Sequence, residues 1–162
     1  MSALVIGIDP GLNGAMALLT SDGVLLDLAD MPVLADGTGG KRAINAALLA
    51  VQVRTWAPGL AYCEFVGARP GEGAVGAFSF GRSRGVIEGA LGALAVPVQM
   101  IAPASWKRRV GIPPGPDRKD AARSEAIRRW PGKADRFARV KDDGRAEACL
   151  IAMAGLMRRG GG

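Results

Sequence analysis

The stretch Leu4-Val5-Ile6-Gly7-Ile8-Asp9-Pro10-Gly11 opens the chain with an apolar run that ends in an acid. The run predicts a buried strand over residues 3–9, and Pro10 and Gly11 turn the backbone away directly after it. An acid at the end of such a strand is unusual, because burial penalises its charge. Asp9 is therefore a candidate functional residue, with a simple turn or cap residue as the alternative.

The segments that follow predict the rest of an α/β fold. Strands are expected at 15–20, 24–29, 59–65 and 96–101, with a hairpin turn at Thr20-Ser21-Asp22-Gly23. Helices are expected at about 41–56, 74–95, 103–110, 117–129 and 143–157, and a glycine-rich loop at 34–40. The order predicts a mixed five-stranded sheet, antiparallel in its first three strands and parallel among the first, fourth and fifth, with helices on both faces. We expect a single domain over 1–159 and a flexible tail at 160–162.

Composition excludes several classes of protein. The 162 residues include no histidine, which removes Ser–His and Cys–His nucleophiles and His-ligated zinc. No apolar run is long enough for a membrane span, and the N-terminus shows no signal peptide, so a cytoplasmic protein without membrane association is expected. Cys63 and Cys149 lie in apolar runs and are expected to be buried and reduced; a disulfide or redox pair is the alternative.

The charge of the chain is basic and uneven. The net charge is +6, and residues 106–145 hold 13 Lys or Arg against six Asp or Glu, so this segment supplies the whole surplus. A basic surface of this kind favours a polyanionic partner, most often nucleic acid. A merely solvated basic face is the alternative.

Three further acids join Asp9. Glu64 ends the fourth predicted strand, which neighbours the first, so the two carboxylates should emerge side by side at one edge of the sheet. Asp143 and Glu147 are four residues apart on the last predicted helix and therefore share one face. The alternatives are a solvated strand end for Glu64, an N-cap for Asp143 and a surface ion pair for Glu147. The neighbouring Asp142 is ambiguous, with a solvent-facing or supporting role favoured.

Four converging carboxylates indicate metal chemistry. Without basic partners they repel one another, so the cluster is stable only if some are protonated or cations fill it. Carboxylate oxygens favour Mg²⁺ or Mn²⁺. Two such ions about 4 Å apart can activate water and stabilise the leaving oxygen of a phosphodiester. This chemistry needs no histidine.

Two glycine-rich patterns are weaker signals. Residues 71–76 match G-x-G-x-x-G, but the strand at 96–101 carries no carboxylate for a ribose, so no nucleotide cofactor is expected. Residues 37–41 hint at a phosphate loop, but Arg42 stands where Ser or Thr is needed, so we interpret the segment as an ordinary loop.

The chain resembles the RuvC-type Holliday-junction resolvases, particularly a divergent phage-like branch. Ile6-Gly7-Ile8-Asp9-Pro10-Gly11, followed by Gly14, is similar to the first-strand motif, and Glu64 to the fourth-strand glutamate. Residues 81–86, 107–112 and Lys119 are similar to the start of the long helix and to basic segments near the active site. Asp143-Gly-Arg-Ala-Glu147 is similar to the final helix motif, with an unusual spacing of four and a glutamate in place of the commoner aspartate. The fourth ligand is thus Asp143 or Asp142, and the aromatic that many members carry three residues after the glutamate is here Gly67.

The resemblance implies a ribonuclease H-like fold and a homodimer that resolves four-way DNA junctions by paired symmetric nicks leaving 5′-phosphate ends. It implies that Asp9, Glu64, Asp143 and Glu147 are catalytic and hold two Mg²⁺ ions, with Mn²⁺ as a substitute. The residues implied to contact DNA are basic: Lys107, Lys119, Arg82, Arg84, Arg108, Arg109 and Arg123. Trp106 could stack on a base, although a core position is the more usual role of a tryptophan.

Three other functions remain open from the sequence. One is a broader structure-selective nuclease acting on forks, flaps or RNA–DNA hybrids. Another is a branched-DNA binder without catalysis, against which the four acids argue. The last is half of a sugar-kinase or actin-type ATPase, whose Gly-Ile-Asp-x-Gly opening is similar, although 162 residues leave no room for its paired domains.

Overall fold

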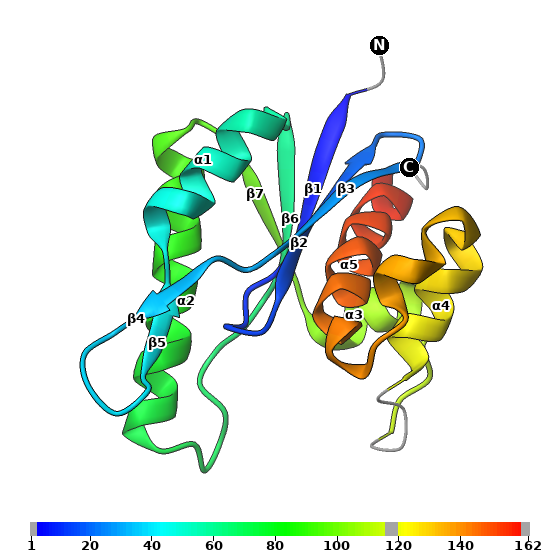
Figure 1. Cartoon of the computed structure of the whole chain (residues 1–162). Helices are drawn as coiled ribbons and strands as arrows, with labels where there is room; N and C mark the ends of the chain where they lie inside the picture. Colours follow the sequence, from blue (N-terminus) through cyan, green and yellow to red (C-terminus); the bar gives the residue numbers. More distant parts are fainter. Residues whose placement is uncertain (1–2, 116–119, 160–162) are drawn as a thin grey trace.

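A computed structural model of the chain describes residues 3–115 and 120–159. Figure 1 shows a central twisted sheet with helices on both faces. The strands are β1 (Leu4–Asp9), β2 (Ala15–Thr20), β3 (Leu25–Asp30), β4 (Val33–Ala35), β5 (Arg42–Ile44), β6 (Leu60–Glu64) and β7 (Val98–Ile101). The α-helices are α1 (Ala46–Trp56), α2 (Ala74–Ala93), α3 (Pro103–Arg109), α4 (Ala121–Arg129) and α5 (Asp143–Arg159), and the 3₁₀ helices are η1 (Pro131–Phe137) and η2 (Val140–Asp142).

The main sheet has the strand order β3-β2-β1-β6-β7. β1 is antiparallel to β2 and β2 to β3, whereas β6 runs parallel to both β1 and β7. The mixed five-stranded sheet predicted from the sequence is therefore confirmed. The helices α1 and α2 cover one face, and α3, α4 and α5 lie on the other (Figure 1).

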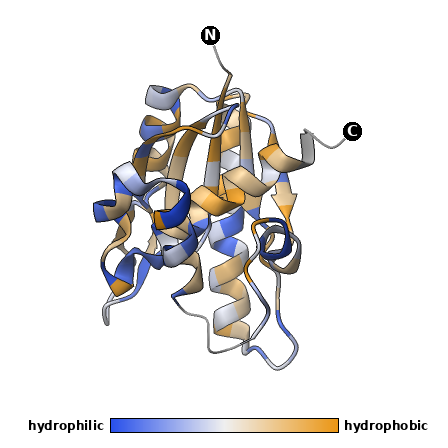
Figure 2. Cartoon of the chain, turned by 90° about the vertical axis from the view of Figure 1, so that its right-hand side faces the viewer, coloured by the Kyte–Doolittle hydropathy of each residue, from blue (hydrophilic) through white to orange (hydrophobic). Residues whose placement is uncertain are grey.

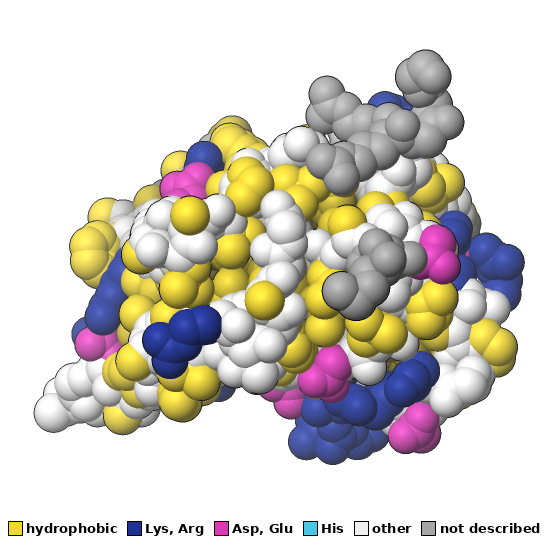
Figure 3. Space-filling model, turned by 90° about the horizontal axis from the view of Figure 1, so that it is seen from above, with side chains coloured by type: hydrophobic (Ala, Val, Ile, Leu, Met, Phe, Trp, Pro, Cys, Tyr) yellow, Lys and Arg dark blue, Asp and Glu magenta, His cyan; other side chains and the backbone are white. Residues whose placement is uncertain are grey.

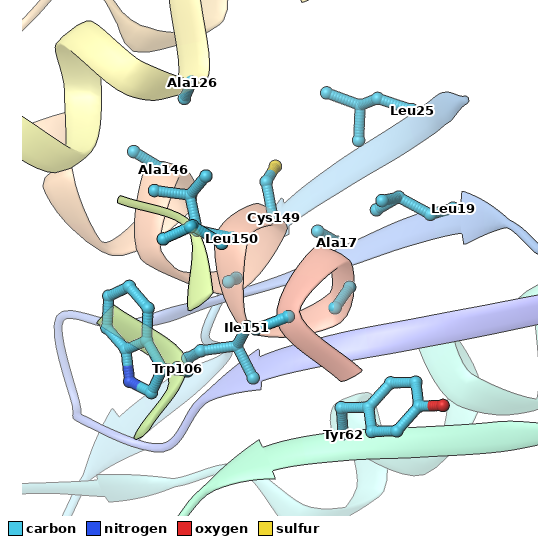
Figure 4. Close-up of a cluster of buried hydrophobic side chains, with 14 of the residues drawn as sticks. Ala17, Leu19, Leu25, Tyr62, Trp106, Ala126, Ala146, Cys149, Leu150 and Ile151 are labelled. Carbon is cyan, nitrogen blue, oxygen red and sulfur yellow. The ribbon is translucent and has the colours of Figure 1, made fainter. Parts of the chain in front are cut away.

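Alternating strand residues build a core on each face of the sheet. Ile6 and Ile8 of β1 point toward the α1 and α2 side, whereas Val5 belongs to the core that contains α5. In Figure 4 Ile151 of α5 points toward the strands, between the buried rings of Trp106 and Tyr62, whereas Ala146 and Leu150 point toward the side where Ala126 of α4 lies. Hydrophobic colouring follows the strands in Figure 2. Cys63 and Cys149 are buried and unpaired, as predicted.

The helix α5 approaches the sheet closely because two glycines leave room for it. A Cβ at Gly7 of β1 would lie 2.0 Å from the carbonyl oxygen of Ala148, and one at Gly155 would lie 2.3 Å from the ring of Tyr62. Both distances are far below van der Waals contact, so any side chain would push α5 away. The two glycines thus fix the position at which the first turn of α5 meets the end of β1.

Two predicted segments differ from the structure. The expected loop at 34–40 and the first residues of the expected helix at 41–56 form a small hairpin, β4–β5, and α1 begins only at Ala46. The helix starts there because the side chain of Asn45 accepts a hydrogen bond of 3.1 Å from the amide of Leu48, which makes Asn45 an N-cap. The 3₁₀ segments over 131–142 were not predicted either.

Other element ends shift by a few residues. β7 begins at Val98, and α4 begins at Ala121 after Asp120. Asp117, with which the helix predicted at 117–129 begins, lies outside the described residues. Among the helices that the structure describes, none combines the length and apolar character needed to cross a bilayer.

Candidate active site

The structure brings Asp9 and Glu64 to the same edge of the sheet. Ile8 of β1 is in register with Cys63 of the parallel strand β6, so the acids that follow them sit at neighbouring strand ends. The amide of Gly11 donates a hydrogen bond of 3.3 Å to Oδ1 of Asp9 as the chain turns. The turn therefore holds the Asp9 carboxylate at the strand tip, as the Pro10-Gly11 sequence predicts.

The first turn of α5 reaches the same place. A Cβ at Gly144 would lie 2.6 Å from the carbonyl oxygen of Asn13 and 3.3 Å from Oδ2 of Asp9. The absence of a side chain at Gly144 therefore lets the first turn of α5 pack directly against the turn after β1, close to the Asp9 carboxylate. Gly144 is flanked by Asp143 and followed by Glu147, so α5 brings both acids to the strand tips.

The electrostatics of the site tie all four acids together. Burial raises the pKa of Asp9 to about 7. The hydrogen bond from the Gly11 amide lowers this pKa, the charges of Glu64 and Asp143 raise it further, and the charge of Lys107 lowers it. Burial also raises the pKa of Glu147 to about 7, with contributions from Asp9, Glu64 and Asp143 and opposition from Lys107. Glu64 and Asp143 contribute to both pKa shifts, and Asp9 also contributes to that of Glu147, so these carboxylates repel one another.

Trp106 fixes the second strand-tip acid. Its indole Nε1 donates a 2.6 Å hydrogen bond to Oε2 of Glu64, and its ring is completely buried. Stacking of Trp106 on a base is therefore wrong, because the ring has no exposed face. The Nζ of Lys107 lies 5.4 Å from the centre of this ring, which places the lysine beside the acids. The hydrogen bond between Trp106 and Glu64 was not predicted from the sequence. The one sequence feature that points to it is a tryptophan, which has an N–H donor, next to Lys107.

Asp142 and Asp143 have different surroundings. Asp142 is 1 % exposed and accepts hydrogen bonds from the backbone and guanidinium of Arg139. The hydrogen bond from the Arg139 side chain holds the pKa of Asp142 below its usual value. A solvent-facing Asp142 is thus wrong. Asp143 is exposed. Its charge, and not that of Asp142, contributes to the raised pKa of Asp9 and of Glu147. The geometry favours Asp143 as the fourth member of the cluster.

The donor set fits divalent cations of the magnesium type. Within residues 3–115 and 120–159, no three acidic or cysteine side chains are already gathered as a metal-ligand group. The charges of Glu64 and Asp143 nevertheless contribute to the raised pKa of both Asp9 and Glu147, and the charge of Lys107 partly offsets these rises. Oxygen ligands with excess negative charge are what Mg²⁺ and Mn²⁺ require. No arginine forms an ion pair with Glu147 in the described part of the chain, so that alternative is wrong.

The remaining basic candidates are spread over the molecule. Arg108 is exposed on α3, and Lys119 lies outside the described residues. Arg109 donates to the carbonyl of Ala154, and Arg123 donates to the carbonyls of Phe137 and Ala138.

Arg82 and Arg84 also have partners on the protein. Arg82 pairs with Asp36, and Arg84 pairs with Glu88 while lying 4.6 Å from the ring centre of Phe65. Of the predicted DNA contacts that the structure describes, Lys107 alone contributes to the pKa of Asp9 and Glu147, and the contact of the arginines with DNA stays a prediction.

Comparison with known proteins identifies the architecture. No protein-family model matches the chain, and no curated protein matches it in sequence. Thermus thermophilus RuvC in complex with a Holliday junction substrate superposes with a TM-score of 0.66 at 18% identity, over 98% of this chain and 96% of that one. The chain has the RuvC fold. A further Thermus thermophilus RuvC structure matches over the same shares, with a TM-score of 0.55. The predicted ribonuclease H-like α/β class is thereby confirmed.

Proposed function

We propose that the protein is a Mg²⁺-dependent endonuclease that cuts branched DNA and resolves four-way junctions. The observation that supports this most strongly is that Asp9 and Glu64 end two adjacent parallel strands, while the charges of Glu64 and Asp143 raise the pKa of both Asp9 and Glu147. Asp9, Glu64, Asp143 and Glu147 would hold two Mg²⁺ ions, for which Mn²⁺ could substitute. Bound ions would activate the attacking water and stabilise the leaving oxygen of the phosphodiester.

The chain's own residues prepare the site for this reaction. The Gly11 amide and the Trp106 indole hold the Asp9 and Glu64 carboxylates in place before any ligand arrives. Lys107 offers a positive charge to the phosphate next to the cut. The pKa of about 7 at Asp9 and Glu147 means that these acids lose their protons near neutral pH, which favours cation binding above it.

Branched DNA is proposed as the substrate from the fold together with the basic charge. Of the solved structures with this fold, Thermus thermophilus RuvC is in complex with a Holliday junction substrate. The net charge of +6 in this chain suits a polyanion. Both observations concern binding; the acids supply the reason to expect cleavage.

A homodimer would match the two-fold symmetry of a four-way junction. The helix α2 offers a surface for it. Val75 is 83% exposed and Phe78 is 72% exposed near its start. Further along, Gly81, Gly85 and Gly89 have open space where a side chain would be, so a second helix could approach closely.

The test is cleavage of a synthetic mobile junction with products mapped on all four strands. We expect Mg²⁺-dependent, symmetric nicks with 5′-phosphate ends, lost in Asp9→Asn while binding is retained. Equal cleavage of forks and RNA–DNA hybrids would instead favour a broader structure-selective nuclease. Binding without cleavage in any divalent cation, or cutting of single strands without junction preference, would contradict the proposal.

A further inference from the structure

A groove of about 820 Å³ opens directly beside the acids. Its walls are the turn after β1, the end of β3, Arg42 of β5, and the segment from η2 into the first turn of α5. Asp143 belongs both to this groove and to the acidic cluster. The groove is therefore continuous with the proposed site, although it is lined by none of the basic residues that the RuvC resemblance predicts to contact DNA. Figure 3 shows a different face, on which basic and acidic side chains lie intermixed near one edge.

Two of the four cations along the groove are neutralised by the protein. Arg145 forms hydrogen bonds of 2.6 and 2.8 Å with the two carboxylate oxygens of Asp30. Arg139 binds Asp142 at 2.8 Å. These pairs brace the wall formed by η2 and the start of α5, and they leave little charge for a ligand.

The other two cations lack an acidic partner within the described chain. Arg42 is held by a neutral group, the side-chain oxygen of Asn13, at 3.0 Å. Lys141 is exposed and forms no ion pair with any residue that the structure describes. The first turn of the 17-residue helix α5 lies on the same wall, and its Gly144 amide donates a hydrogen bond of 2.8 Å to the side chain of Asp143. The groove thus presents two cations without an acidic partner, Arg42 and Lys141, and Asp143 of the acidic cluster lines the same groove.

We propose that this groove holds the sugar-phosphate backbone of the DNA strand flanking the cut, with Arg42 and Lys141 each contacting a phosphate. The inference rests on the proposed nuclease function and adds the path of the strand. An extended polyanion suits the groove better than a small anion, because its two free cations come from different walls. The contact of Arg42 with Asn13 also ties the β4–β5 hairpin to the turn that follows Asp9, so binding there would steady the loop beside the acids.

The binding test uses fluorescence anisotropy of a labelled four-way junction in an Asp9→Asn background, across a range of salt. Removing the side chain that neutralises one phosphate should lower the slope of log K against log salt by about 0.9. We therefore expect Arg42→Ala and Lys141→Ala each to lower the slope by about one, and Arg42→Lys to restore most of it. Arg54→Ala is the matched control: Arg54 is exposed in the last turn of α1, near the start of β6, and its removal should leave the slope unchanged.

A second measurement locates the contacts on the DNA. Neutral methylphosphonates placed singly on either side of the cut should weaken binding of the parent protein at two flanking positions. At one of these positions the methylphosphonate should not weaken DNA binding by Lys141→Ala, because the variant already lacks the side chain that contacts this phosphate.

The outcomes separate the two proposals. If Lys141→Ala and Arg42→Ala match the control in slope, while the parent chain with Asp9 intact still cleaves junctions, the groove assignment is wrong and the nuclease stands. If the parent chain neither cleaves nor binds junctions, the nuclease proposal itself fails. Thermal unfolding of each variant checks that folding is intact.

Discussion

Replacing Asp9 by asparagine should make the metal-free protein more stable at pH 8, even though the same change should abolish cleavage. The Asp9 carboxylate is buried at the end of β1 and is repelled by the charges of Glu64 and Asp143. Its charged form is therefore unfavourable in the folded state without a cation. Asparagine has nearly the same shape and keeps an oxygen for the amide of Gly11. It removes the charge and little else.

The size of the effect follows from the pKa of Asp9. A rise from 3.8 to about 7 corresponds to roughly 4 kcal/mol between the two protonation states, as an upper value. The folded pKa lies above the unfolded one, so the metal-free parent loses stability as pH rises from about 4 to about 7 and then levels off. The advantage of Asp9→Asn should therefore be near zero at pH 4, grow by about 1.4 kcal/mol per pH unit, and reach about 2–4 kcal/mol at pH 8.

The assay is thermal unfolding in EDTA at several pH values. For a chain of this size, the expected gain at pH 8 is a Tm increase of about 4–15 °C. Asp135→Asn serves as the control, because Asp135 is exposed in η1 and its replacement should change Tm little. Addition of Mg²⁺ should raise the Tm of the parent and leave that of Asp9→Asn almost unchanged. A Tm for Asp9→Asn at or below that of the parent at pH 8, or a difference independent of pH, would refute the reasoning.

Three further predictions concern the surroundings of the acids. Trp106→Phe keeps an aromatic ring in the core but removes the donor to Glu64, so the affinity for Mg²⁺ should fall about 10–100-fold. The control Trp56→Phe removes an indole–carboxylate hydrogen bond elsewhere and should leave the Mg²⁺ affinity unchanged. Equal effects of the two substitutions would contradict a positioning role for Trp106. The two acids with a pKa of about 7 compete with protons for the cation, so the Mg²⁺ concentration for half-maximal cleavage should fall about tenfold or more between pH 6 and pH 8, and a flat profile would count against their role. Gly155→Ala should lower the free energy of unfolding by about 1–3 kcal/mol or more, measured in urea, because its Cβ would overlap the Tyr62 ring; an unchanged value would show that α5 can move.

Sequence patterns predicted the parts of the site that depend on local order. An apolar run that ends in an acid occurs twice, at Asp9 and at Glu64, and parallel pairing of neighbouring strands brings the two ends together. The spacing of four between Asp143 and Glu147 placed both on one side of the last helix. These inferences need only strand alternation and helical periodicity.

Contacts between distant segments could not be predicted in the same way. The bond from Trp106 to Glu64 joins residues 42 positions apart and depends on how α3 packs. Counting charges over 106–145 indicated a basic segment, but could not show that Arg123 binds backbone carbonyls while Lys141 forms no ion pair with any described residue. The hairpin β4–β5 was missed because the glycines of 34–40 indicate a loop and Ile44 also fits the helical spacing of the segment that follows; only the cap at Asn45 marks where the helix begins.

The central claim is that side-chain oxygens of Asp9, Glu64, Asp143 and Glu147 bind divalent cations together. Anomalous diffraction from crystals grown with Mn²⁺ measures this directly. We predict two manganese peaks among these four carboxylates, absent in Asp9→Asn crystals grown in the same way. Manganese bound only elsewhere, or well-ordered carboxylates with no peak between them at saturating Mn²⁺ and pH 8, would contradict the account.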